Sequence, residues 1–258
     1  NRSLNFTNVR FVVEADGYME ITPVTNEVVV TVTGNHDTKV YDGNAHTVTG
    51  YTVQTNNPLY TESSFKFTGT ASASRTDAGK TMMGLTPAQF ENTDGNFEKV
   101  TFVVDDGYME ITPVTDEVVV TVTGNHDTHV YDGNAHTVTG YAVSGISNPL
   151  YPQSGISFTG TASASRTDAG KTMMGLTPAQ FENTDGNFEK VTFVVDDGYM
   201  EITPVTDEVV VTVTGNHDTH VYDGNAHTVT GYAVSGISNP LYPQSGISFT
   251  GTASASQT

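Results

Sequence analysis

Apolar and polar residues alternate at period two along most of this 258-residue chain. In Glu27–Thr33, for example, Val28, Val30 and Val32 share one face, and such alternation is typical of strands with one buried face. The other strand segments that the pattern predicts are Thr47–Val53, Phe67–Ser74, Thr81–Leu85, Val100–Val104 and Met109–Thr112. We therefore expect an all-β fold with six or seven short strands in every 90 residues or so.

Two turn signals punctuate these strands. Asp-Asp-Gly-Tyr at 105–108 predicts a hairpin between the strands on either side of it. Thr86-Pro87-Ala88-Gln89 predicts a capped helical turn, with Thr86 at the N-cap and Pro87 at the first position. Short strands with regular turns favour an antiparallel β-sandwich of the Greek-key, immunoglobulin-like kind. A β-grasp-like arrangement remains the alternative.

The chain is a tandem array. The string VYDGNAHTVTGY begins at Val40, Val130 and Val221, at offsets of 90 and 91 residues, which is the size of a small autonomous domain. Residues 24–113 and 114–204 are then complete repeats. Residues 1–23 match the end of a preceding repeat, and residues 205–258 match the beginning of a further one. We expect separate domains, with more repeats upstream and downstream.

The joint between repeats is short. It runs over Ile111–Glu117 and contains Pro113 but no Gly- or Ser-rich spacer. Proline fixes its own φ and biases Thr112 toward extended geometry. The sequence therefore predicts limited bending between neighbouring domains.

The composition of the chain argues against several classes of function. With 29 acidic and 10 basic side chains, the formal net charge is −19, which disfavours binding to nucleic acid or to anionic membranes. The absence of cysteine excludes disulfides, thiolate metal sites and cysteine catalysis. No apolar run approaches the roughly 20 residues that a membrane-spanning helix needs. No nucleophile with a base at a recognisable spacing and no phosphate-binding glycine loop occurs, so we do not expect an enzyme.

The repeated motifs resemble a known family. The pattern EVVVTVTGN…VYDG…HTVTGY…NPLY…FTGTASASRTDAG…NFEKVTFVV…DGYMEITP, complete in residues 24–113 and 114–204 and partial at both ends of the chain, is similar to the YDG- or MBG-type repeats of large cell-surface proteins and adhesins of Gram-positive bacteria. The resemblance implies an extracellular, all-β array on the bacterial cell surface, anchored to the cell wall through a region outside this sequence. It says little about activity.

Four sets of side chains are candidates for chemistry. His126, Asp127 and His129 have the residue types and spacing of a transition-metal site, although Lys39 replaces the last of them in the first copy. The acidic residues Asp105, Asp106, Glu110, Asp116 and Glu117 are candidate Ca²⁺ ligands, without a loop of fixed spacing. The alternative for both sets is that they form a solvated polar surface without a bound metal.

The other two sets concern ligands and cross-links. Tyr60, Tyr151 and Tyr242 follow Asn-Pro-Leu in a loop and are candidate sugar contacts, or else loop anchors in the core. The lysines that recur between copies are candidates for an intramolecular isopeptide bond, which needs a buried amine beside Asn or Asp and a carboxylic acid, or are ordinary exposed side chains. These lysines are Lys80, Lys171, Lys99 and Lys190.

Three functions remain open. The first is an extended extracellular stalk that projects a binding domain from the cell, with neighbouring repeats as its main partners. The second is a multivalent adhesin, whose weak sites for host glycan, mucin or protein gain avidity from repetition. The third is a filament subunit, in which residues 1–23 of one chain complete residues 205–258 of the next by strand addition.

Overall fold

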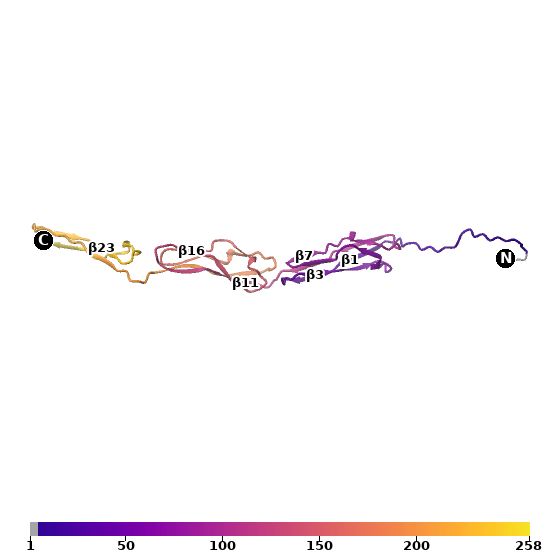
Figure 1. The fold of residues 1–258 in the computed structure, drawn as a ribbon, viewed down its shortest axis with the longest axis horizontal. Helices are drawn as coiled ribbons and strands as arrows, with labels where there is room; N and C mark the ends of the chain where they lie inside the picture. Colours follow the sequence, from indigo (N-terminus) through magenta and orange to yellow (C-terminus); the bar gives the residue numbers. More distant parts are fainter. Residues whose placement is uncertain (1–4) are drawn as a thin grey trace. The chain divides into compact units, whose positions relative to one another are not determined.

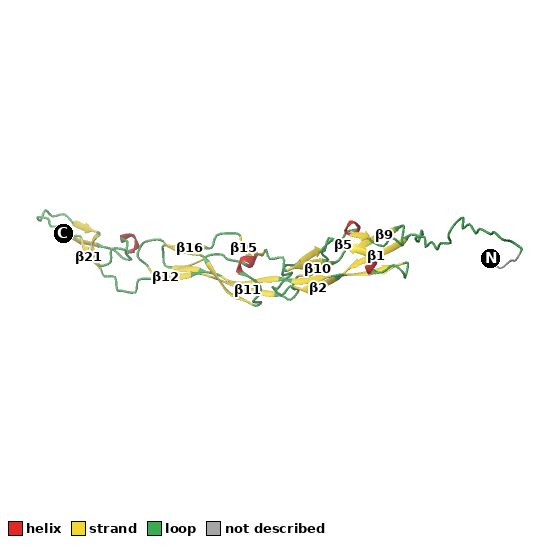
Figure 2. Ribbon diagram, turned by 45° about the vertical axis from the view of Figure 1, so that its right-hand side comes forward, coloured by secondary structure: helices red, strands yellow, loops and turns green. Residues whose placement is uncertain are grey.

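The computed structural model describes residues 5–258, which divide into two compact units (Figure 1). Unit 1 extends to Asp116 and includes Gly186–Glu189; unit 2 consists of Glu117–Asp185 and Lys190–Thr258. In the described residues the regular structure is strands and single 3₁₀ turns (Figure 2). The all-β prediction is confirmed. No helix in the described range has the length and apolarity to span a membrane.

Unit 1 has ten short strands and two 3₁₀ turns in its described part. These are β1 (Val28–Gly34), β2 (His36–Val40), β3 (His46–Thr49), β4 (Tyr51–Thr55), η1 (Glu62–Ser64), β5 (Phe65–Phe67), β6 (Ser72–Arg75), β7 (Gly79–Met82), η2 (Pro87–Gln89), β8 (Phe90–Asn92), β9 (Val100–Asp105) and β10 (Tyr108–Thr112). They form two three-stranded sheets, in the orders β4-β1-β9 and β2-β10-β7, and the pairs β3-β6 and β5-β8.

The first and last strands of the repeat run side by side and parallel. Val30 in β1 lies opposite Phe102 in β9, and Thr38 in β2 lies opposite Glu110 in β10. The hairpin predicted at 105–108 is therefore wrong, because β9 and β10 do not pair with each other. The expectation of wholly antiparallel pairing is wrong for the same strands.

A close backbone contact explains the glycine in this bend. A Cβ on Gly107 would collide with the carbonyl oxygen of Asn35, and a Cβ on Gly34 would collide with the backbone nitrogen of Gly107. The chain passes from β9 to β10 beside the break between β1 and β2, where the two backbones are in contact. Gly107 thus allows two backbone segments to come into contact, and it does not form a hairpin turn.

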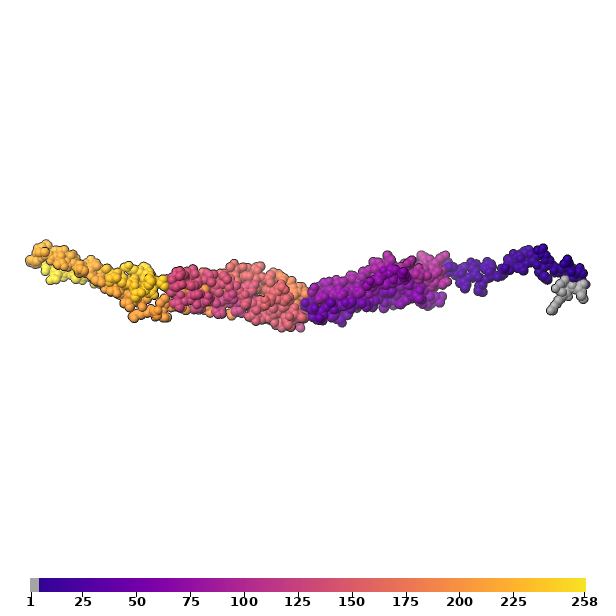
Figure 3. All heavy atoms as spheres, in the orientation of Figure 1, coloured from indigo at the N-terminus to yellow at the C-terminus, as the bar shows by residue number. Residues whose placement is uncertain are grey.

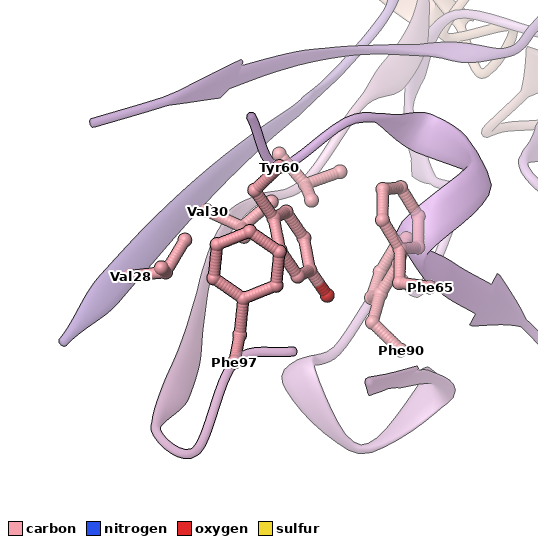
Figure 4. Close-up of a cluster of buried hydrophobic side chains, with 7 residues drawn as sticks. Val28, Val30, Tyr60, Phe65, Phe90 and Phe97 are labelled. Atoms are coloured by element: carbon pink, nitrogen blue, oxygen red, sulfur yellow. The ribbon is translucent and has the colours of Figure 1, made fainter. Parts of the chain in front are cut away.

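Each sheet of unit 1 covers a cluster of apolar side chains. The alternating valines Val28, Val30 and Val32 are buried, as predicted, against Tyr60, Phe65, Phe90 and Phe97 (Figure 4). A second cluster joins Met109 and Ile111 of β10 to Ala73, with Tyr41, Val48 and Met83 packed around them. The repeat therefore encloses its own core.

Two predicted strands are interrupted in the structure. Thr47–Val53 is divided into β3 and β4 at Gly50, whose φ of 87° lies in the left-handed region that favours glycine. Phe67–Ser74 is divided into β5 and β6. The predicted turn after Thr86 is confirmed as η2, and Thr86 N–H donates to Gln89 Oε1 at 2.7 Å.

Unit 2 contains one copy of this arrangement and part of another. Its elements are β11 (Val118–Gly124), β12 (His126–Val130), β13 (His136–Thr139), β14 (Tyr141–Ile146), η3 (Gln153–Gly155), β15 (Ile156–Phe158), β16 (Ser163–Arg166), β17 (Gly170–Met173), η4 (Pro178–Gln180), β18 (Phe181–Asn183), β19 (Val191–Asp196), β20 (Tyr199–Thr203), β21 (Val211–Gly215), β22 (His227–Thr230), β23 (Tyr232–Ile237), η5 (Gln244–Gly246) and β24 (Ser254–Gln257). Strands β11 to β20 repeat the pairing of β1 to β10, whereas β21 to β24 form only the pairs β21-β23 and β22-β24.

Candidate functional site

The predicted metal ligands do not converge. His126 stacks on Tyr199 with ring centroids 5.2 Å apart, whereas His129 Nε2 pairs with Asp127 Oδ2 at 3.0 Å and its ring stacks on His136. Positions 126 and 129 lie on opposite faces of β12, because strand side chains alternate. Within the described residues no group of three or more His, Cys, Asp or Glu could hold a metal ion.

Tyr-Asp-Gly residues build a turn. Asp132 Oδ1 accepts the backbone N–H of Asn134 at 2.9 Å and lies 3.0 Å from His136 Nε2. The hydrogen bond from Asn134, followed by that from His136, lowers the pKa of Asp132 to about 2. Gly133 has a φ of 79°, which fits a turn residue.

The acidic residues that were candidate Ca²⁺ ligands bind separate partners within the fold. Asp106 accepts the N–H groups of Gly84 and Leu85, both at 2.9 Å. Glu110 pairs with Lys80, and the pKa of Glu117 is lowered by the hydroxyl of Thr192 and by Lys190. The described residues therefore assemble no oxygen cage of the kind that Ca²⁺ requires.

The candidate cross-linking lysines form surface ion pairs with glutamates. Lys80 and Lys171 lie over tyrosine rings and pair with Glu110 and Glu201, at 3.6 and 3.4 Å. Lys99 and Lys190 pair with Glu27 and Glu117, at 3.3 and 3.4 Å. All four amines are well exposed. These lysines therefore lack the buried environment that isopeptide formation needs, and the prediction of a cross-link at these positions is wrong.

The candidate sugar-binding tyrosines of the complete repeats are core residues. Tyr60 and Tyr151 are buried, and the hydroxyl of Tyr151 lies 2.7 Å from Gly155 O and 2.9 Å from Asn183 Oδ1. An exposed ligand-contacting role for these two is wrong, and the loop-anchor interpretation describes them. Tyr242 is partly exposed.

A socket for an Asn-Phe turn is present in unit 1. The N–H of Ala78 donates to Asn187 Oδ1 at 2.7 Å, and Asn187 Nδ2 donates to Asp77 Oδ1 at 3.3 Å. The ring of Phe188 meets Tyr41 edge to face, with centroids 5.6 Å apart, and Phe188 is buried. The turn is thus held by hydrogen bonds with Asp77 and Ala78 and by the ring of Tyr41.

Unit 2 holds an open version of the same socket. Tyr131, Asp168 and Ala169, which match Tyr41, Asp77 and Ala78 in sequence, line a cavity of about 430 Å³. The rest of its wall includes Val205 and the partly exposed Tyr242. We call this cavity, with these five residues, the Asn-Phe pocket.

A second hollow lies along residues 205–258. It has a volume of about 500 Å³, and its lining includes Tyr222, Val229 and Ala255. The matching residues of the complete repeat are Tyr131, Val138 and Ala164, which pack on Met200 and Ile202. We call this hollow the Met-Ile groove.

The sequence analysis missed both hollows. The signal was available as the identical Tyr-Asp-Gly, Asp-Ala-Gly and Asn-Phe strings of the copies. The strings alone do not show that these residues meet in the fold, because Ala78 and Asn187 are 109 residues apart in the sequence.

Comparison with known proteins adds no relative. No protein-family model, curated protein or solved structure matches this chain. The resemblance to YDG- or MBG-type repeats therefore depends on the motif residues alone, as do the location and function that it implies.

Proposed function

We propose that this chain is part of an extended extracellular stalk, a structural repeat array of a bacterial surface protein. The observation that carries the proposal is that each complete repeat builds its valine core from its own strands. Val28, Val30 and Val32 in one repeat and Val118, Val120 and Val122 in the next are all buried. A repeat whose valine core is its own can be multiplied along a chain, as a spacer requires. The Asn187–Phe188 turn of the second repeat adds a contact to Tyr41 and Ala78 of the first.

The chemistry of the surface supports the same proposal. The residues that suggested metal, cross-link or sugar sites make turn contacts, ion pairs or core contacts instead. A net charge of −19 keeps such an array soluble and resists sideways association. The tyrosines on which a glycan-binding array would depend are buried in the complete repeats, so no observation favours that alternative.

Small-angle X-ray scattering on the 258-residue chain, at high dilution, tests the stalk. Strands rise about 3.3 Å per residue, so domains joined end to end predict a rod with a maximum dimension above roughly 100 Å. A folded globule of this length has a radius of gyration of about 18 Å. A value near that figure would mean that the repeats pack on one another, which would contradict the proposal.

A further inference from the structure

We propose that two loops of the first repeat (24–113) form a docking surface for the Asn-Phe turn of the second (114–204), and that this contact couples the stability of consecutive repeats. The loops are the Tyr-Asp-Gly turn (41–43) and the Asp-Ala-Gly loop (77–79). The Asn-Phe turn is Gly186–Glu189, which belongs to the second repeat in sequence but to unit 1 in the structure. This inference deepens the stalk proposal and rests on it for its purpose.

The docking surface lies where the chain leaves the first repeat. Thr112, at the end of β10, lies opposite Val40, which directly precedes the Tyr-Asp-Gly turn, and Ile111 lies opposite Gly79 of the Asp-Ala-Gly loop. The atoms near residue 40, violet in Figure 3, lie at the end of the first repeat that is remote from the indigo residues preceding the repeat. Both loops are therefore placed beside the start of the joint.

Arg75 gives the Asp-Ala-Gly loop its shape. Its Nε donates to Asp77 O at 2.7 Å, and its Nη2 donates to Ala78 O at 2.6 Å. Because the peptide unit is planar and trans, the N–H of Ala78 points opposite to the carbonyl of Asp77. The N–H is thus directed away from Arg75, to the side where Asn187 Oδ1 accepts it. Gly79 completes the loop with a φ of 128°, and a Cβ there would collide with the guanidinium of Arg75.

Asn187 suits this surface because its side-chain amide offers both an acceptor and donors. Its Oδ1 accepts the Ala78 N–H at 2.7 Å, and its Nδ2 donates to Asp77 Oδ1 at 3.3 Å. An aspartate in the same place would offer no donor and would bring a second negative charge to Asp77. The ring of Phe188, which is 2% exposed, adds an edge-to-face contact with Tyr41. The surface therefore selects the residue types Asn and Phe.

The Asn-Phe turn is bonded to the joint as well. Val114 N–H donates to Asn187 O at 2.9 Å, and Glu189 N–H donates to Val114 O at 2.9 Å, so that Val114 and Phe188 form a parallel bridge. Val114 directly follows Pro113 in the joint. Asn187 thus bonds the joint with its backbone and the first repeat with its side chain.

A second Tyr-Asp-Gly turn also meets the copy that follows it. Gly133 belongs to this turn in the second repeat, and a Cβ there would lie 3.2 Å from Cδ2 of Leu241 in the third copy. Both residues belong to unit 2. The contact supports a general role of the Tyr-Asp-Gly turn in recognising the next repeat.

Hydrogen exchange of the Ala78 amide, followed by NMR on the full chain with isotopically labelled alanine, is the primary test. We expect a protected amide in the original chain. Asn187→Ala should raise its exchange rate by about tenfold, because the acceptor of the hydrogen bond is lost. An Ala78 amide that exchanges freely in the original chain would overturn the docking surface.

Asn96→Ala is the matched control for this substitution. Asn96 has the same place in the Asn-Phe turn of the first repeat, where its Nδ2 donates to Asp94 Oδ1 at 2.8 Å. The control removes the same side chain from the same kind of turn, so it should leave the exchange rate of Ala78 within about twofold. Equal rates in Asn96→Ala and Asn187→Ala would show a general loss of stability and would overturn the specific contact. Circular dichroism checks that both variants fold.

A core variant of the second repeat tests the coupling. Val120→Asp places a charge in a fully buried position and should unfold that repeat. We expect the Ala78 amide to lose its protection, and the amide of Val30, which reports global unfolding of the first repeat, to exchange at least about threefold faster. Val194→Asp adds the same charge at an exposed position of the second repeat and should change neither rate. An Ala78 amide that stays protected in Val120→Asp, or an unchanged Val30 rate, would overturn the coupling.

Small-angle X-ray scattering of the same samples separates this inference from the stalk. An extended particle in which the Ala78 amide exchanges freely would overturn the docking surface and leave the stalk intact. A compact particle in which the protection of Ala78 depends on Asn187 would overturn the stalk and support the docking surface.

Discussion

The hydroxyl of Tyr60 lies 3.2 Å from Ser64 O and 3.1 Å from Asn92 Oδ1, two acceptors that share its single proton. Its ring packs edge to face on Phe97, with centroids 5.1 Å apart. Burial raises the pKa of this tyrosine above its ordinary value. One side chain thus ties the Asn-Pro-Leu-Tyr loop to two other segments of the repeat.

Substitution of Tyr60 should reduce stability in two steps. Tyr60→Phe removes the hydrogen bond of the hydroxyl at a cost of about 0.5–1.5 kcal/mol, because Ser64 O and Asn92 Oδ1 keep the N–H groups of Thr93 and Asp94 as donors. Tyr60→Ala also removes the ring and should cost about 3–5 kcal/mol. Urea unfolding measures both values. Leu59→Ala, at an exposed neighbour, should change the free energy of unfolding by less than about 0.5 kcal/mol; equal effects at both positions would contradict the core role.

The aspartates of the Tyr-Asp-Gly turns should make the protein sensitive to acid. The backbone N–H of Asn44 and the His46 side chain lower the pKa of Asp42 to about 2, from an ordinary 3.8. Because folding lowers this pKa, the ionised carboxylate favours the folded state above pH 3.8, and its contribution disappears as the pH falls through about 2. Asp132 behaves in the same way.

The measurement is a carboxyl titration by NMR, followed by urea unfolding at pH 5 and pH 2.5. We expect both carboxyls to titrate near pH 2. In Asp42→Asn/Asp132→Asn, stability should decline less between the two pH values than in the original chain. An ordinary titration near pH 3.8 would show that the turn hydrogen bonds do not form in solution.

At the scale of elements, the close approach of the β1–β2 bend to the β9–β10 bend depends on Gly34 and Gly107, since neither has a Cβ. The methylene of Gly107 lies against the backbone of Gly34 and Asn35. This contact lets both pairs of strands run parallel through the bend, with hydrogen-bonded registers on either side of it. Any Cβ here meets backbone, which cannot rotate away.

Gly107→Ala should therefore destabilise its repeat by about 1–3 kcal/mol or more, as over-packing does in other cores. Gly95→Ala is the matched control, because a Cβ there meets nothing within 4 Å. We expect the control to change stability by less than about 0.5 kcal/mol. Thermal unfolding monitored by near-ultraviolet circular dichroism compares the two, and similar midpoints would contradict the close approach.

The same bend shows what the sequence can predict and why it stops there. Alternating valines at 28, 30 and 32 predict their burial, because period two is a local property of a strand. Asp-Gly at 106–107 is also a local signal, but its glycine serves a contact with Gly34, which is 73 positions away in sequence. Likewise, the Asn-Phe pocket needs residues from distant segments. Local patterns predict strands, whereas pairing direction and pockets depend on long-range contacts.

At the scale of the whole molecule, charge and joint length both act on the stalk that we propose. A formal charge of −19 makes neighbouring repeats repel one another over about 10 Å at 0.1 M ionic strength, and farther at lower salt. The joint over Ile111–Glu117 is short and contains Pro113, which restricts bending without any help from charge. The extension of the chain should consequently depend on its joints more than on its charge.

The radius of gyration of the chain should therefore change little as sodium chloride is raised. Screening shortens the Debye length from about 30 Å at 0.01 M to about 8 Å at 0.15 M, which removes most of the repulsion between repeats. Small-angle X-ray scattering at the two salt concentrations, with the same low protein concentration, should give the same radius of gyration. A value that falls toward the roughly 18 Å of a globule of this length at the higher salt would mean that charge repulsion, and not the short joints, keeps the repeats apart, and would contradict a stalk of limited bending.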